Sequence, residues 1–119
     1  MTTTIDNVTL ALRGLGYKVS LSPHEKIELK EIVITLEGID IETETSGSYF
    51  LTYTYALNFM SNSIVDIATN IPIFINTIDK AAVGTAPDFQ SVTPEITKQD
   101  GTLYLVAMKF TFKDTLVIT

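Results

Sequence analysis

The sequence predicts an α+β fold in which an antiparallel β-sheet, containing a long β-hairpin, is covered on one face by two α-helices. Three observations support this prediction. Two segments space their apolar residues at helical intervals, other segments alternate apolar with polar residues as strands do, and turn-forming residues separate the segments. The predicted order is α-β-β-β-α-β-β. The length of 119 residues suits a single domain, residues 1–119, with one hydrophobic core.

Residues 4–15 predict a short amphipathic helix. Thr3 and Asp6 have the spacing of a capping box at its start, and Gly16 suits the left-handed conformation that often ends a helix. The apolar stripe of this segment consists of Ile5, Val8, Ala11, Leu12 and Leu15.

A short strand is predicted over residues 17–21, with the Ser22-Pro23 turn behind it. Residues 27–45 then predict a long strand whose apolar residues change phase at Gly38. Ile32, Ile34 and Leu36 alternate on one face before this glycine, and Ile39 and Ile41 follow in the opposite phase. A β-bulge at Gly38 would restore one continuous buried face, so we predict a bulge there.

Ser46-Gly47 supplies a turn, and residues 49–60 form the clearest strand pattern of the chain. Together with residues 27–45 this segment makes a hairpin whose arms each exceed ten residues, well above the mean strand length of about 5–6. Hairpins of that length commonly project beyond their own core. A projecting arm usually pairs with another polypeptide segment.

The second helix is predicted from Ile64 to Ile78. Ser63 and Asp66 have capping-box spacing. The apolar residues from Ile64 to Ile78 follow the i, i+3, i+4, i+7 spacing of an amphipathic helix. Pro72 removes one backbone donor in the middle, so either the helix kinks or two short helices meet there. The uninterrupted apolar stripe favours one kinked helix.

Residues 81–91 predict a long loop of the kind that often serves as an interaction surface. A final hairpin follows, with an edge strand over residues 92–98 that contains Pro94, a turn at Asp100-Gly101 and a central strand over residues 103–113. The apolar tail, residues 116–119, is either a last strand or a contact segment.

Composition favours self-association and argues against binding to nucleic acid. The chain is 45% hydrophobic and 18% charged, with a mean hydropathy of +0.26. A small domain of this composition has more apolar side chains than its interior needs. This excess favours a surface that faces a partner, and a homo-oligomer. The net charge is -6, and Arg13 is the single arginine among eight basic residues, so no groove-reading basic surface is expected.

Catalytic motifs are missing from the sequence, and we therefore expect a protein that is not an enzyme and uses no cofactor or metal. There is no cysteine, and His24, the single histidine, sits in a polar loop without an identifiable partner. No nucleophile elbow or phosphate-binding loop occurs. The N-terminus lacks the features of a signal peptide and no apolar run is long enough to span a bilayer, so we expect a cytoplasmic chain without membrane contact.

Seven of the fourteen acidic residues fall within residues 25–44. They are Glu25, Glu28, Glu31, Glu37, Asp40, Glu42 and Glu44. The spacing fails as an EF-hand, and a glycosidase pair is possible but lacks support because neighbours two apart on a strand are simply a charged face. We favour a solvated or edge-protecting face and keep a functional acidic surface as the alternative.

The chain resembles a family of phage proteins. The helix that ends in Leu12-Arg13-Gly14-Leu15-Gly16-Tyr17, the long hairpin, the single helix after it and the closing strands look like the tail terminator or tail completion proteins of long-tailed bacteriophages. Those proteins share this length and order of elements across nearly the whole chain.

This resemblance implies a structural virion protein of the tail or neck, assembled in the host cytoplasm. Such proteins form a ring, usually hexameric, that caps the tail tube and joins it to the head connector. The expected partners are other copies of the chain, the tail tube protein and the head-completion or connector protein. The candidate contacts with neighbours or tube are Ser46, Gly47, Tyr49, Phe50, Val83, Phe89, Leu116 and Ile118.

DNA that passes through such a ring should not adhere to it. An acidic lumen repels phosphate, whereas a basic lumen would trap it. The candidate lumen or acidic surface consists of Glu37, Asp40, Glu42 and Glu44. Three other hypotheses remain: another oligomeric neck or tail protein, a small-molecule-binding module with a cavity between helix and sheet, and an enzyme with carboxylate chemistry.

Overall fold

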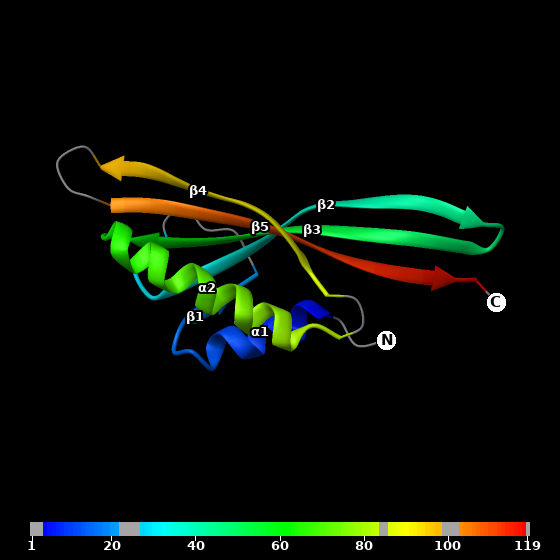
Figure 1. Cartoon of the computed structure of the whole chain (residues 1–119), viewed down its shortest axis with the longest axis horizontal. Helices are drawn as coiled ribbons and strands as arrows, with labels where there is room; N and C mark the ends of the chain where they lie inside the picture. Colours follow the sequence, from blue (N-terminus) through cyan, green and yellow to red (C-terminus); the bar gives the residue numbers. More distant parts are fainter. Residues whose placement is uncertain (1–3, 22–26, 84–85, 99–102, 119) are drawn as a thin grey trace.

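A computed structural model describes residues 4–21, 27–83, 86–98 and 103–118. Within these residues two helices and five strands follow one another in the predicted order, so the α+β fold class is confirmed (Figure 1). The elements are α1 (Thr4–Arg13), β1 (Lys18–Ser20), β2 (Glu31–Thr45), β3 (Ser48–Ser61), α2 (Ile64–Ala81), β4 (Asp88–Lys98) and β5 (Leu103–Val117).

The five strands form one sheet in the order β1-β2-β3-β5-β4. The pairs β2–β3, β3–β5 and β5–β4 are antiparallel, whereas β1 runs parallel to β2. The expectation of a purely antiparallel sheet was therefore wrong at this edge, because the alternation of apolar and polar residues carries no information on the direction of a neighbouring strand. The helix α2 joins β3 to β4, and β5 lies between these two strands, as in a split β-α-β unit.

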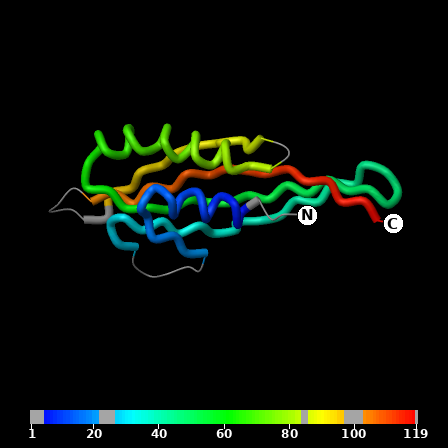
Figure 2. The backbone as a smooth tube through the Cα atoms, turned by 90° about the horizontal axis from the view of Figure 1, so that it is seen from below, coloured from blue at the N-terminus to red at the C-terminus, as the bar shows by residue number. Residues whose placement is uncertain are grey.

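Both helices lie side by side on the same face of the sheet, as predicted (Figures 1 and 2). The core lies between these helices and the sheet. Phe74 of α2 is its centre, with its ring edge-on to Phe59 at 5.1 Å and to Tyr17 at 5.3 Å between ring centroids. The fully buried core side chains on this face are Val8, Leu12, Ile32, Ile34, Leu57, Phe74, Ile78, Val106, Met108 and Phe110.

The helix ends follow the local signals of the sequence. Gly16 has φ +95°, and its N–H donates to the carbonyl of Arg13 at 3.0 Å, so the predicted left-handed C-cap is confirmed. The Ser63 hydroxyl accepts a hydrogen bond from the Asp66 N–H at 3.3 Å, as an N-cap does. The other predicted capping residue, Thr3, lies outside the described residues.

The helix α2 continues without a break through Pro72, so the prediction of one helix rather than two is confirmed. Pro72 is exposed on the side that faces away from the sheet. Water can therefore bond the carbonyl of Ala68, which the proline leaves without its usual backbone donor.

The bulge predicted at Gly38 is confirmed. The register between β2 and β3 shifts between Leu36 and Gly38, so Glu37 is the extra residue. The bulge brings Ile39 and Ile41 onto the same face as Leu36, as predicted. The expected burial of this face was wrong, however, because these three side chains are 46%, 70% and 52% exposed, respectively.

The C-terminal tail belongs to β5, which extends to Val117 instead of ending near residue 113. Val117 pairs with Ser48, and the Ile118 N–H donates to the carbonyl of Gly47 at 2.7 Å. The projecting element is therefore three-stranded rather than a simple hairpin. It contributes to an elongated molecule of 57 × 26 × 22 Å.

The connection between α2 and β4 is shorter than the predicted loop of residues 81–91, because β4 already begins at Asp88. An irregular register between Phe89 and Val92 hid this strand from the alternation pattern. The edge position of Pro94 and the central position of β5 are both confirmed. The predicted turns at Ser22-Pro23 and Asp100-Gly101 lie outside the described residues.

Replacing the central aromatic ring tests this core. We expect Phe74→Ala to lower the free energy of unfolding by about 3–5 kcal/mol, because a fully buried phenylalanine leaves a cavity that its neighbours cannot fill. Urea titration followed by circular dichroism measures this loss. Asn76→Ala, on the exposed side of the same helix, is the control and should change stability by less than about 0.5 kcal/mol. Equal effects of both variants would contradict the described packing.

Candidate interaction surface on the projecting arm

The sheet extends well beyond the helices that cover it. We call this extension the arm and define it as residues 36–45 of β2, 48–54 of β3 and 112–117 of β5. Figure 2 shows both helices over one part of the sheet and the arm extending past them. The strand β3 is paired on both sides throughout the arm, whereas β2 and β5 each have one side there without a partner strand in the part of the chain that the structure describes.

One face of the arm continues the face that the helices cover. The register aligns Ile41 with Leu51 and Asp114 in one row, and Tyr49 with Leu116 in the row nearer the tip. We call this surface the arm face. Its exposed and half-buried members are Leu36, Ile39, Ile41, Thr43, Tyr49, Leu51, Tyr53, Asp114 and Leu116, whereas Phe112, which pairs with Tyr53 on the same face, is buried. Asp114 is its single charged member, so the arm presents a nearly uncharged apolar surface to solvent.

The opposite face of the arm is mainly polar, with Phe50 and Val117 as its large apolar members. Asp40, Thr52 and Lys113 form one row across the three strands, and Glu42 lies in the next row. An ion pair of 3.4 Å joins Glu37 at the bulge to Lys109 of β5. Glu44, at a second register shift, accepts a hydrogen bond from the Ser48 hydroxyl at 2.9 Å.

The acidic surface predicted from the sequence is therefore brought together along the arm. The four carboxylates of Glu37, Asp40, Glu42 and Glu44 share this polar side with Lys109 and Lys113, which leaves it two charges negative. Because they follow the outer strand β2, they also lie along an otherwise unpaired strand edge, where charge and bulges discourage pairing with another chain.

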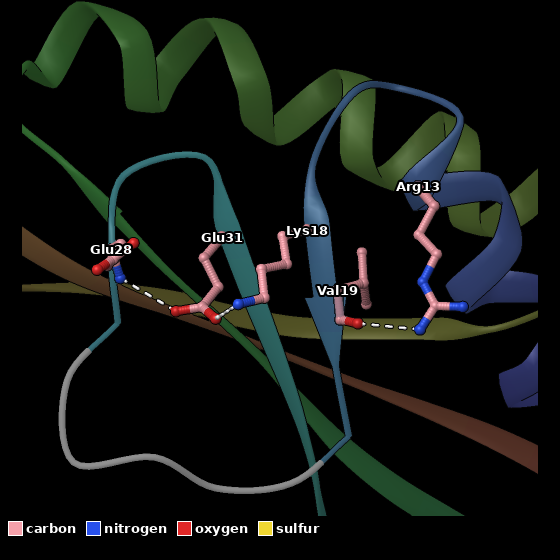
Figure 3. A network of polar contacts seen from close by, with 5 residues as sticks. All are labelled: Arg13, Lys18, Val19, Glu28 and Glu31. Carbon is pink, nitrogen blue, oxygen red and sulfur yellow. Dashed lines mark hydrogen bonds and ion pairs between the residues drawn. The ribbon is translucent and has the colours of Figure 1, made fainter.

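Other acidic residues of the same sequence run have a structural role. Glu31 is 5% exposed at the start of β2; its carboxylate accepts from the Glu28 N–H at 3.1 Å and lies 4.0 Å from the Lys18 ammonium (Figure 3). In the same corner Arg13 donates to the carbonyl of Val19 at 3.1 Å and so ties the end of α1 to β1 (Figure 3). Glu25 lies outside the described residues.

Most of the predicted contact residues meet at the tip of the arm. Gly47 has φ +81°, a conformation that favours glycine, and it forms the turn with Ser46 between β2 and β3. Leu116 and Ile118 are 43% and 60% exposed beside this turn. The predicted residues that share the tip are Ser46, Gly47, Tyr49, Phe50, Leu116 and Ile118.

The remaining two predicted contact residues lie elsewhere. Val83 is 57% exposed just after α2. Phe89 is half-buried, with its ring centroid 6.1 Å from that of Phe110, and it packs against the core. The sequence interpretation missed Leu36, Ile39 and Ile41 as surface residues, because their periodicity assigns them to a covered face and says nothing about where the cover ends.

An open pocket of about 360 Å³ lies at the start of α2, away from the arm. Its lining includes Tyr17, Lys30, Asp66 and Asn70, and the Lys30 ammonium lies 4.7 Å from the centroid of the Tyr17 ring. Lys30 has φ +65°, an uncommon conformation for a residue with a side chain. The small-molecule-binding hypothesis would use this surface pocket, whereas the expected space between helix and sheet is filled by the aromatic core.

Metal chemistry finds no support in the described part of the chain, which contains no group of three or more histidine, cysteine, aspartate or glutamate side chains able to hold a metal ion. Neither of the described helices is long and apolar enough to cross a membrane. His24, the single histidine of the sequence, lies outside the described residues. No protein-family model matches this chain, and no curated protein matches it either.

Two tyrosines predict how stability depends on alkaline pH. Burial, with a contribution from Asp66, raises the pKa of Tyr17 above its ordinary value of 10.0. Burial, followed by Tyr53 and Asp6, raises the pKa of Tyr55 in the same direction. The folded protein therefore holds these protons more tightly than the unfolded chain, so their stabilisation is complete below about pH 10 and is lost as the pH rises through the folded-state pKa values.

We expect the double variant Tyr17→Phe, Tyr55→Phe to lose less stability than the parent protein between about pH 9 and 11, since phenylalanine cannot ionise. Urea titrations at several pH values measure this difference. The same pair of proteins at pH 7, where both tyrosines are neutral, gives the baseline. Parallel losses of stability in the two proteins across this range would contradict the assignment.

Proposed function

We propose that the chain is a structural assembly protein whose copies associate through the arm into a ring, and that it acts as a tail terminator or tail completion protein of a phage. The observation that carries this proposal is the arm face, an apolar sheet surface that extends past the helices of its own chain. The face of an antiparallel sheet that is rich in apolar residues is normally packed on a core. Left in solvent, such a surface marks an interaction site.

The shape of the molecule supports a ring-forming role. The arm face and the helix layer lie at different ends of the long axis, so a contact between the two in neighbouring copies would be of the head-to-tail kind, which forms a ring when the rotation between copies closes. In the proposed role the ring caps the tail tube and joins it to the head connector, with six copies as the resemblance implies. The tail tube protein and the connector are then its partners in the virion, and the chain performs no catalysis.

Self-association through the arm face is tested by placing a charge in it. We expect the parent protein to form a closed oligomer at high concentration, and Ile41→Lys to raise the dissociation constant at least about tenfold, or about 1.4 kcal/mol, because an ammonium would have to be desolvated in the contact. Light scattering coupled to gel filtration measures the masses. Thr115→Lys adds the same charge to the opposite face of the same arm and is the matched control.

If Thr115→Lys dissociates the oligomer as strongly as Ile41→Lys does, the contact does not use the arm face. A parent protein that stays monomeric at every concentration, and also in the presence of tail tubes, would contradict the proposal as a whole.

The acidic side of the arm gives a separate prediction for the assembled particle. If it lines the channel of the ring, replacing Glu37, Asp40, Glu42 and Glu44 by lysine should let the channel hold DNA through its phosphates and lower infectivity. Infectivity titres of particles that carry this variant measure the effect, and electron microscopy checks that the tails are complete. Complete particles with unchanged infectivity would contradict the lumen assignment, although they would leave ring formation intact.

A further inference from the structure

The molecule has a second exposed apolar surface, on the helix α2. Between Asp66 and Asp79 this helix contains no charged residue at all. Its side away from the sheet exposes Val65 and Ile73, which are 72% and 43% exposed, together with small and uncharged side chains. We call this surface the α2 outer face. It consists of Val65, Ala68, Thr69, Pro72, Ile73 and Asn76, all of them exposed.

An ordinary surface helix turns charged and polar residues toward water. One side of α2 is buried in its own core through Ile67, Phe74 and Ile78. The other side lacks charge between Asp66 and Asp79 and exposes Val65 and Ile73 beside the polar Thr69 and Asn76. An exposed surface with apolar residues and without charge is suited to contact with another surface.

From these two surfaces we infer that the α2 outer face of one copy docks on the arm face of the next copy. This inference rests on the proposed function, and it names the two surfaces through which the ring forms. The contact would repeat between copies the arrangement that exists within each chain, where α2 packs on the helix-covered face of the sheet. The arm face continues that sheet face, so the neighbour's helix would extend the helix layer along it.

The α2 outer face fits within the arm face. From Val65 to Asn76 it covers 12 residues of α2, about 18 Å at 1.5 Å per residue. The arm face from Leu36 to Thr43 covers eight residues of β2, which is about 26 Å at 3.3 Å per residue. Three strands spaced about 4.8 Å apart make it about 14 Å wide, enough for one helix.

The contact area favours a ring over a pair. An arm face of about 26 × 14 Å gives at most about 700 Å² of surface buried on both partners together, which is below the range of stable interfaces. Head-to-tail docking uses both surfaces of every copy, so two contacts hold each copy of a closed ring and together bury at most about 1,400 Å². Two arm faces packed on each other would bury one such area and leave both helices uncovered.

The strand edges of the arm also favour docking through the arm face. Strand pairing between copies would have to use one of the two unpaired edges of the arm. On the outer side of β2, Glu37 and Glu44 interrupt the register and Asp40 and Glu42 add charge, and on the outer side of β5, Lys113 and Asp114 add charge. Bulges and charges of this kind oppose edge-to-edge pairing. The arm therefore offers its face rather than its edge to another copy.

Cross-linking can test this docking because the chain contains no cysteine. Ile41→Cys places a thiol on the arm face, and Ile73→Cys places one on the α2 outer face. The two full-length variants, one of them carrying a tag that changes its mass, are mixed at a concentration where the parent protein is oligomeric. A short bis-maleimide then joins thiols that lie close together, and gel electrophoresis separates the products.

We expect a cross-linked dimer that contains one tagged and one untagged chain. Its yield should be several-fold above the yield of cross-linked dimer that either variant gives alone. Thr115→Cys, on the polar face of the same arm, replaces Ile41→Cys in the matched control and should give little product with Ile73→Cys. Each variant is first shown by circular dichroism and light scattering to fold and assemble like the parent protein. A second pair, Ile39→Cys with Val65→Cys, covers the case in which one variant fails this check.

Three results would overturn the inference. Efficient cross-linking of Ile41→Cys to itself would show that arm faces pack on each other, and equal yields with Thr115→Cys would show that the two surfaces have no preferred contact. An oligomeric sample without any mixed product would show that the ring uses other surfaces, and it would leave the proposed function standing. A sample that is monomeric under all conditions and gives no product would overturn both.

Discussion

The structure depends on a mismatch in length between its two layers. At about 3.3 Å per residue the 15 residues of β2 and of β5 extend over about 50 Å, whereas the 18 residues of α2 cover about 27 Å. A helix about 27 Å long cannot cover strands about 50 Å long. The uncovered arm follows from this difference, and so does the division of each long strand into a half that belongs to the core and a half that faces outward.

The bulge at Glu37 keeps the two halves of β2 in phase. A slip of one residue exchanges the two faces of a strand, so if Glu37 paired regularly instead of forming a bulge, Ile39 and Ile41 would join the polar side of the arm. With it, the apolar face of the sheet runs continuously from the core into the arm. Where the described part of the chain does not cover this face, apolar side chains stay in contact with water, which is unfavourable unless another surface binds there.

Local signals were enough to predict much of the fold. The N-cap at Ser63, the left-handed Gly16, the bulge near Gly38 and the edge position of Pro94 each follow from the chemistry of one to four neighbouring residues. Non-local features were not predictable in this way. The parallel pairing of β1 with β2 and the extension of β5 along β3 to Val117 depend on segments far apart in sequence, about which periodicity carries no information.

The candidate interaction surface could likewise be predicted only in part from the sequence. Alternation correctly assigned Ile39 and Ile41 to one face, but whether that face is buried depends on where α1 and α2 end in space. Likewise the acidic run of the sequence looked uniform, while the structure divides it between a buried Glu31 that accepts hydrogen bonds and four carboxylates along the arm. Sequence identifies the chemistry of each residue, and the arrangement in space decides its role.

The composition of α2 and the length of the arm leave two surfaces of the same chain uncovered. The helix is uncharged between Asp66 and Asp79, and its outer side exposes Val65 and Ile73 beside the polar Thr69 and Asn76. The arm has an apolar face without a cover, and β2 carries charges along the edge of the arm while its arm face is uncharged. In the proposed ring the two surfaces would cover each other between copies. A contact of small area would leave an isolated pair weak, whereas closing the ring would give the two end copies of an open chain their second contact as well.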